Sequence, residues 1–206
     1  MDLLPIKITA RRGNWQRFMA RKVSTNKAFP PVRDKVFERD DYTCRYCGFQ
    51  AKRFQEVVNI DQNYSNNTLD NLATACSFCS QCFFLDSVGF DSRSGGTVIH
   101  LPEMTQSDLN HFCRALFCSM LREPPYKGKL QAVYLSLQDR GKAVETALGP
   151  SAQDPTVFGQ SLIDSQLDEK QLNHPIFSEL RLLPLRKPFK QQAEYWKSTL
   201  FAHIPL

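Results

Sequence analysis

The chain has 206 residues, of which 42% are hydrophobic and 23% charged, and its formal net charge is +5. This composition is that of a globular protein with an ordinary apolar core, which excludes an intrinsically disordered chain. No run approaches the roughly 18 apolar residues of a membrane span, and Met1 to Arg12 is too short and mixed for a signal peptide, so we expect no direct membrane insertion.

Positive charge gathers at the start of the chain. Residues 1 to 53 hold thirteen Lys or Arg against five acids, whereas residues 54 to 89 hold four acids and neither Lys nor Arg. A nucleic-acid interface would place cations on phosphates and stack bases on aromatic side chains. The candidates are Arg11, Arg12, Arg17, Arg21 and Lys22, with Trp15 and Phe18 between them. A solvated basic face, or a surface for an acidic protein, explains the pattern equally, and the cation-free stretch favours this second interpretation.

The first predicted elements precede the cysteines. Leu4 to Ala10 alternates apolar and polar residues, which indicates an edge strand, and Gly13-Asn14 indicates a turn. Pro30-Pro31 then breaks the chain before a short predicted helix over Val32 to Arg39. Val36 of this helix is expected to pack inward.

Two Cys-x-x-Cys pairs define the middle of the chain. Cys44 and Cys47 form the first, and Cys76 and Cys79 form the second after 28 intervening residues. Each pair can place two thiolates on one metal ion, and two pairs complete the tetrahedral sphere of structural zinc. We predict one structural Zn²⁺ at these four cysteines, with no open position for catalysis, although four thiolates also suit iron.

The remaining cysteines fit a reducing compartment. Seven cysteines, four of them in metal-binding pairs, match the cytoplasm better than a disulfide framework. Cys113 and Cys118 are expected to be small buried residues. Cys82, one helical turn after Cys79, is either another buried residue or a substitute metal ligand.

The segment between the pairs is predicted to form strands joined by a polar loop. Phe54 to Ile60 is β-rich, and Asn63 to Asn67 is polar, with Asn66-Asn67 suited to positive φ. Leu69, Leu72 and Ala73 then lead the chain back to the second cysteine pair.

The region from Val32 to about Leu85 resembles the HNH family of ββα-metal nucleases. The matching parts are Val36 to Gly48, the β-rich stretch ending at Ile60, Asp70-Asn71-Leu72, and the closing Cys76 and Cys79. The resemblance implies a zinc-built ββα module.

The same resemblance implies that the chemistry of these nucleases is lost. An HNH nuclease generally has Asp-His before the Ile, where the His is a general base, and an Asn or His after the last cysteine that helps hold a catalytic ion. This chain has Val58, Asn59 and Ser80 at those places. We therefore expect no catalytic residues and no enzyme activity. Asn71 is kept, but its side chain can serve the hydrogen bonds of the loop.

No other titratable group forms a recognisable catalytic set. Asp61, Asp70 and Asp86 are scattered carboxylates of the kind that cap helices or lie in solvated loops. His100, His111, His174 and His203 lie outside the cysteine region and are expected to be structural.

The second half of the chain is predicted to be mainly helical. After a short strand at Thr97 to Leu101, Thr105 resembles an N-cap with Asp108 as its partner, and apolar residues recur at helical spacing up to Met120. A second apolar stripe runs from Leu130 to Leu148.

Glycine and proline interrupt the chain after this second stripe. Gly149-Pro150 is a helix stop signal, and residues 149 to 160 indicate a linker or surface loop. The apolar tail after Phe177 either folds back on the core or remains an exposed docking surface. Its Tyr195 and Trp196, beside Lys190 and Lys197, have the composition of an interface anchor.

Together these expectations give an α+β fold in three parts. Residues 1–30 form an N-terminal strand and basic segment, residues 31–90 an HNH-like zinc module, and residues 91–206 a mainly helical region packed on it.

Over nearly its whole length, including the Asp2-Leu3-Leu4 start, the layout resembles a coupling-complex component of Dot/Icm type IVB secretion systems. The resemblance implies a non-catalytic zinc-stabilised adaptor that binds the C-terminal extension of the inner-membrane coupling ATPase and other coupling-complex subunits and aids effector recruitment. It also implies a cytoplasmic protein held at the inner membrane by its partners. A divergent HNH endonuclease and a nucleic-acid-binding protein are the alternatives, and we do not expect nucleic acid as the partner.

Overall fold

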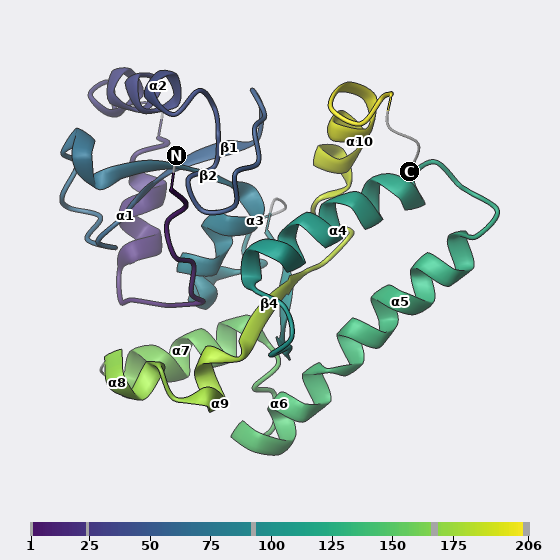
Figure 1. Cartoon of the computed structure of the whole chain (residues 1–206). Coiled ribbons are helices and arrows are strands. Elements are labelled where there is room, and N and C mark those ends of the chain that lie inside the picture. The colour runs from purple at the N-terminus through teal and green to yellow at the C-terminus, as the bar shows by residue number, and fades with distance from the viewer. Residues whose placement is uncertain (1, 24, 92–93, 166–168, 204–206) are drawn as a thin grey trace.

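The computed structural model describes residues 2–23, 25–91, 94–165 and 169–203 (Figure 1). In this part of the chain helices outweigh strands, and the strands form two small antiparallel sheets. The predicted mixture of helix and sheet is therefore confirmed. None of the described helices is both long and apolar enough to cross a membrane.

The described residues form helices, strands and 3-10 turns with the following bounds. The helices are α1 (Asn14–Ala20), α2 (Phe29–Arg39), α3 (Ser77–Ser80), α4 (Gln106–Met120), α5 (Lys127–Asp139), α6 (Gly141–Leu148), α7 (Pro155–Ser165), α8 (Glu169–Leu172), α9 (Pro175–Ser178) and α10 (Lys190–Thr199). The strands are β1 (Gln55–Asn59), β2 (Leu72–Cys76), β3 (Gly96–His100) and β4 (Leu180–Pro184), and the 3-10 turns are η1 (Leu69–Asn71), η2 (Gln81–Phe83) and η3 (Leu85–Ser87). Figure 1 shows α4 in the middle, with the β1–β2 hairpin, α1 and α2 on one side and α5 on the other.

The start of the chain is extended but belongs to neither sheet. The Leu4 N–H donates to the Arg45 carbonyl at 2.7 Å, and the Thr9 N–H donates to the Cys82 carbonyl at 2.7 Å. The Leu85 N–H in turn donates to the Thr9 carbonyl at 3.1 Å. The predicted edge strand at Leu4 to Ala10 is therefore wrong, because its main-chain bonds lie only at its two ends and form no ladder. The alternation that suggested it reports burial: the side chains of residues 4, 6 and 8 are half-buried, whereas those of residues 3, 5 and 7 are exposed.

The two helices before the cysteines differ from expectation in extent. Gly13 adopts φ 77° as predicted for a turn, and it caps α1, a helix that the sequence pattern missed. α2 begins at Phe29, three residues before the predicted Val32, because prolines are tolerated in a first turn where the N–H groups have no helical partner. Val36 is fully buried against Val57 and Leu72, as predicted.

The β1–β2 hairpin confirms the strand predicted over Phe54 to Ile60. Its register runs from Gln55 opposite Cys76 to Asn59 opposite Leu72. The predicted positive φ at Asn66-Asn67 is wrong, and Gln62 takes that conformation at φ 57°.

Asparagine side chains hold the hairpin loop instead. The Asn66 amide donates to Asp61 Oδ2 at 3.0 Å, and the Asn71 amide donates to Asp61 Oδ1 at 2.8 Å. The loop is therefore closed by side-chain hydrogen bonds rather than by a glycine-like turn at its tip.

The C-terminal tail folds back on the core. β4 pairs with β3 from Gly96 opposite Pro184 to His100 opposite Leu180, which confirms the strand predicted at Thr97 to Leu101 within one residue. Trp196 of α10 is fully buried, with its ring 5.4 Å from the ring of Phe78. An exposed anchor at Trp196 is therefore excluded.

The helical half is divided more finely than its sequence pattern suggests. The Thr105 cap is confirmed, since its hydroxyl accepts from the Asp108 N–H at 3.1 Å. The predicted second stripe is split into α5 and α6 at Arg140, and Gly149 ends α6 at φ 104° as predicted.

The linker predicted over residues 149 to 160 is partly wrong, because α7 begins at Pro155. The Asp154 carboxylate accepts from the Thr156 N–H at 2.8 Å and thus caps this helix, while Pro155 suits its first turn. Gly159 of α7 then lies against the backbone of η3: a Cβ atom there would stand 2.4 Å from the Asp86 nitrogen.

One apolar cluster joins the cysteine region to the helical half. It contains the four paired cysteines together with Phe78 and side chains of α4 and α10. A second cluster unites Cys82 and Leu85 with α6, α7, β3 and β4. Each sheet therefore shares an apolar cluster with the helices around it.

Replacing Gly159 with alanine is expected to destabilise the protein by about 1–3 kcal/mol, since the added methyl group overlaps the η3 backbone. Gly128→Ala is the matched control, because nothing lies within 4 Å of the atom it adds to α5. That variant should be neutral or stabilising by up to about 1 kcal/mol. Urea unfolding of both variants measures the contrast, and an equal effect on both would contradict the close approach.

Candidate metal centre

The four cysteines of the two pairs lie together in the interior. All four Sγ atoms lie within 4.8 Å of one another, and those of Cys47 and Cys76 are 3.7 Å apart. Each of the four residues is buried, and each is a free cysteine. Zn–S bonds of about 2.3 Å in a tetrahedron place sulfurs about 3.8 Å apart, so the group can hold one metal ion.

Different local structures present the two pairs. The first lies in a turn in which Gly48 takes φ 73° and donates its N–H to the Cys44 carbonyl at 2.8 Å. The second begins at the last residue of β2 and ends in α3. A bond from the Arg45 N–H to the Thr74 carbonyl, at 2.8 Å, ties the turn to β2.

Asp40 fixes the approach to the first pair. Its buried carboxylate accepts from the Thr74 N–H at 2.9 Å and from Arg39 Nε at 2.9 Å. Burial alone would raise the pKa of this carboxyl, but hydrogen bonds from Arg39 and Thr74 outweigh it and hold the pKa below its usual range. Asp40 therefore stays charged and couples the end of α2 to β2. The sequence around Asp40 indicates only a turn, so it does not predict that this carboxylate connects α2 to β2.

Helix α4 supplies hydrogen-bond donors to two of the four sulfurs. Asn110 Nδ2 lies 3.2 Å from Cys79 Sγ, and Arg114 Nη2 lies 3.3 Å from Cys76 Sγ. The spacing of four residues places both side chains on one face of the helix. Donors aimed at sulfur favour the thiolate over the thiol, which is the form that binds metal.

Arg114 is a buried cation inside an apolar cluster. It is 1% exposed, and its guanidinium carbon lies 3.6 Å from the centre of the Phe49 ring. Among the described residues it forms no ion pair with an aspartate or glutamate. A buried charge is costly unless it is compensated. Four thiolates around a divalent ion leave two negative charges, so a loaded centre would provide the compensation.

The ring of His111 contacts the main chain of the first cysteine pair. Its Nε2 lies 2.6 Å from the Cys47 carbonyl oxygen, and Arg114 Nη1 lies 3.2 Å from its Nδ1. A guanidinium can only donate, so Nδ1 accepts and Nε2 carries the proton that is donated to Cys47. His111 therefore links Arg114 to the main chain of the first cysteine pair, and its contact with Cys47 raises the pKa of the ring above its usual value.

The other histidines lie in separate places. His100 Nε2 is 3.0 Å from Glu179 Oε2, His174 caps α9, and His203 lies in a turn after α10. Among the described residues, the only group of at least three potential metal ligands is the four cysteines. The scattered Asp61, Asp70 and Asp86 are thus not brought together as a cation site.

The residues that stand at the HNH catalytic positions make structural contacts. Val58 is fully buried, and the amide of Asn59 donates to the Asn63 carbonyl at 3.0 Å and to that of Asn66. The Ser80 hydroxyl donates to the Ser77 carbonyl at 3.3 Å. The Asn59 amide nitrogen and the Ser80 hydroxyl are therefore bonded to the backbone around them, whereas the buried Asn59 Oδ1 has no hydrogen-bond partner among the described residues.

The basic start of the chain offers fewer free groups than its sequence suggests. Arg21 is 6% exposed and donates to the Tyr64 carbonyl at 3.0 Å, and Phe18 is buried. Lys22 and Arg12 pair with acids, at 2.7 Å to Glu56 and 3.3 Å to Asp164. Trp15 packs on Phe84, with its ring 5.6 Å away. Arg11 and Arg17 remain exposed.

The remaining thiols lie apart from the four. Cys82 Sγ donates to the Phe78 carbonyl at 3.3 Å, and burial raises its pKa well above the usual range. Burial likewise raises the pKa of Cys113 to about 12 and that of Cys118 to about 11. All three are neutral buried thiols at physiological pH, as expected, and Cys82 does not belong to the sulfur cluster.

Comparison with known proteins gives one strong match. The chain is 43% identical over 199 residues to the type 4 apparatus protein DotN of Legionella pneumophila subsp. pneumophila, and the match covers 97% of this chain and 92% of DotN. No protein-family model matches the chain.

Arg114→Met is expected to weaken metal binding about 10- to 100-fold, because it removes both a donor to Cys76 and the compensating charge. Competition with a chromophoric chelator measures the affinity. Arg114→Lys, which retains the positive charge, should reduce the metal affinity less than Arg114→Met does.

Cys113→Ala is the matched control for this prediction. It disturbs the packing of the same helix but leaves the four ligands and their donors in place, so its metal affinity should equal that of the unmodified protein. Equal affinity in the Arg114→Met variant would show that the guanidinium does not compensate the centre.

Proposed function

The chain belongs to the DotN (IcmJ) family of type IV secretion apparatus proteins, and we propose that it acts there as a zinc-stabilised adaptor without catalytic activity. The resemblance to Dot/Icm components that its sequence layout indicates is thereby confirmed. As a component of a secretion apparatus, the protein has its partners within that complex.

We propose zinc as the metal. Four buried sulfurs, the donors Asn110 and Arg114, and the compensating guanidinium support a divalent ion in a closed four-thiolate sphere. Such an ion would supply structural stabilisation, which in small zinc peptides is worth on the order of 10–16 kcal/mol. Cys44, Cys47, Cys76 and Cys79 would hold it.

We further propose that residues 31–90 are a degenerate HNH-like module, preceded by the basic segment 1–30 and covered by the helical region 91–206. The support is the order of its parts: the first cysteine pair, the β1–β2 hairpin and then α3, which carries the end of the second pair.

The absence of catalysis rests on the use of particular side chains. Asn59 cannot accept a proton near neutral pH, and its amide is already engaged by two loop carbonyls. Ser80 is a weak metal ligand, and its hydroxyl bonds to its own helical turn. The four thiols fill a tetrahedral sphere and leave no position for an activated water.

The proposed partner is the C-terminal extension of the coupling ATPase of the inner membrane, with other coupling-complex subunits beside it. Through them the protein would sit on the cytoplasmic face of that membrane and help to recruit effectors. Membership of the DotN family supports the role in the apparatus, and the resemblance in layout motivates the specific partner.

A nucleic-acid role has one observation in its favour, the excess of cations in residues 1–53. The burial of Arg21 and the ion pair of Lys22 with Glu56 count against it, whereas the Arg12 side chain stays 79% exposed in its pair with Asp164.

Affinity purification of the tagged full-length protein from its own organism, followed by mass spectrometry and elemental analysis, tests the adaptor function. We expect the coupling ATPase and further apparatus subunits, together with one zinc per chain. An iron-coloured protein would overturn the choice of metal, and recovery of nucleic acid without apparatus subunits would overturn the adaptor.

Incubation of the zinc-loaded protein with duplex DNA in Mg²⁺ or Mn²⁺ tests the absence of catalysis. We expect no cleavage. Cleavage that is abolished by Asn59→Ala or Asp61→Ala would instead assign a divergent nuclease.

A further inference from the structure

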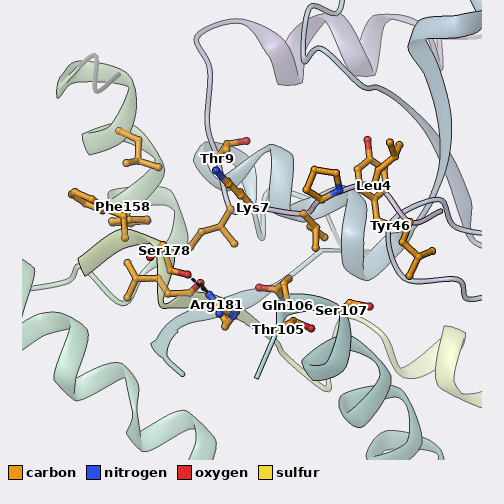
Figure 2. Close-up of a pocket in the computed structure, with 17 residues that line it drawn as sticks. Leu4, Lys7, Thr9, Tyr46, Thr105, Gln106, Ser107, Phe158, Ser178 and Arg181 are labelled. Atoms are coloured by element: carbon orange, nitrogen blue, oxygen red, sulfur yellow. Dashed lines mark hydrogen bonds between the residues drawn. The ribbon is translucent and has the colours of Figure 1, made fainter. Parts of the chain in front are cut away.

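A groove of about 440 Å³ lies between the start of the chain and the helical region. One wall is the extended segment of residues 3–9, and the other is formed by the first residues of α4, by α7 and α9, and by the start of β4. Figure 2 shows Leu4, Lys7 and Thr9 along one side, with Thr105, Gln106 and Arg181 facing them. The groove lies outside the four-cysteine centre, and the proposed adaptor function assigns no partner to it.

The extended wall of the groove has unpaired main-chain groups. Its backbone is anchored at Leu4 and at Thr9, but between them residues 5–8 form no main-chain hydrogen bond with any described residue. Three N–H and four C=O groups therefore have no main-chain partner among the described residues, since Pro5 lacks an N–H, and alternate residues present theirs along the same edge. An extended backbone with open polar groups is a template for pairing with another strand.

Apolar side chains from both walls line the groove. Leu4 and Ile6 come from the extended segment, and Phe158, Leu162 and Phe177 come from α7 and α9. These side chains can receive the apolar residues of a strand at alternate positions, because successive side chains of a strand point to opposite faces. Residues 5–8 span about 13 Å, which suits four or five residues of a partner strand.

The charge of the groove selects the occupant. Lys7 and Arg181 line it, and no aspartate or glutamate does. Three carbonyls hold the Arg181 guanidinium in place, those of Met104 at 2.7 Å, Ser178 at 2.6 Å and Leu180 at 2.7 Å. A cation fixed in this way binds a carboxylate with little further loss of side-chain freedom.

We propose that this groove binds an extended segment of another apparatus subunit, which adds as a strand to residues 5–8 and carries alternating apolar residues and at least one carboxylate. The proposal rests on the adaptor function, because the partner is a subunit of the same complex. It specifies the binding face and the chemistry of the bound segment.

Fluorescence anisotropy with overlapping synthetic peptides that tile the cytoplasmic segments of the other apparatus subunits tests the proposal. The peptides that bind should combine alternating apolar residues with Asp or Glu. N-methylation of their alternate amides should abolish binding, because it removes the donors of a strand pair. Replacing their acids with the neutral amides should weaken binding at least about tenfold.

Two variants place a repelling charge in the groove without touching the metal centre. Ser107→Glu adds a carboxylate in the first turn of α4, where acids are favourable, so the protein should fold normally. Lys7→Glu reverses one of the two cations. Each should weaken peptide binding at least about tenfold, whereas Lys129→Glu, the same change on the exposed face of α5, should not alter it.

The possible outcomes separate this proposal from the function on which it depends. If no peptide binds, if the bound peptides tolerate N-methylation, or if Ser107→Glu binds them as tightly as the unmodified protein, the groove is not the strand site. If the Ser107→Glu protein still copurifies with every apparatus subunit at unchanged yield, the groove proposal fails and the adaptor function stands. Copurification of no subunit by the unmodified protein removes both.

Discussion

The contact between a buried guanidinium and a cluster of sulfurs is the interaction on which the rest of the structure depends. Arg114 and Asn110 reach from α4 to Cys76 and Cys79, so the helical half of the chain supplies part of the environment of the four thiols. Neither side chain would be stable at that depth without a polar or charged acceptor. The cysteine region and the helical region are therefore parts of one electrostatic unit, and the apolar cluster around them is continuous.

Residues at the positions where this chain departs from the nucleases that it resembles are used for structural contacts. In the function proposed above the cysteine pairs hold a metal ion for structure alone, and the positions that correspond to nuclease residues do not belong to the group that could bind it. Asn59 now closes the hairpin loop and Ser80 bonds within its own turn. The helical region and the C-terminal tail pack on the cysteine region through a shared apolar cluster.

Short-range patterns in the sequence predicted what depends on short-range geometry. The spacing within each cysteine pair, the β-rich run at β1 and the cap at Thr105 were all readable, because each involves residues within a few positions of one another. The donors on α4 could not be predicted in this way, since they lie at least 31 positions along the chain from the sulfurs that they contact.

The edge strand predicted at Leu4 to Ala10 failed for a related reason. Alternation indicates which side chains are buried and says nothing about where the main chain finds its hydrogen-bond partners. α7 was missed because the glycines and prolines of its neighbourhood outweighed the Asp154-Pro155 start signal.

The closing position of α10 sets an order of assembly. Trp196 lies against Phe49, two residues after Cys47, and against Phe78, which directly precedes Cys79, and its ring is 5.3 Å from the Arg114 guanidinium. α10 follows all seven cysteines in the sequence, so it leaves the ribosome after them. During synthesis the four paired thiols are therefore not yet covered by Trp196, and a metal ion could reach them before α10 packs in place.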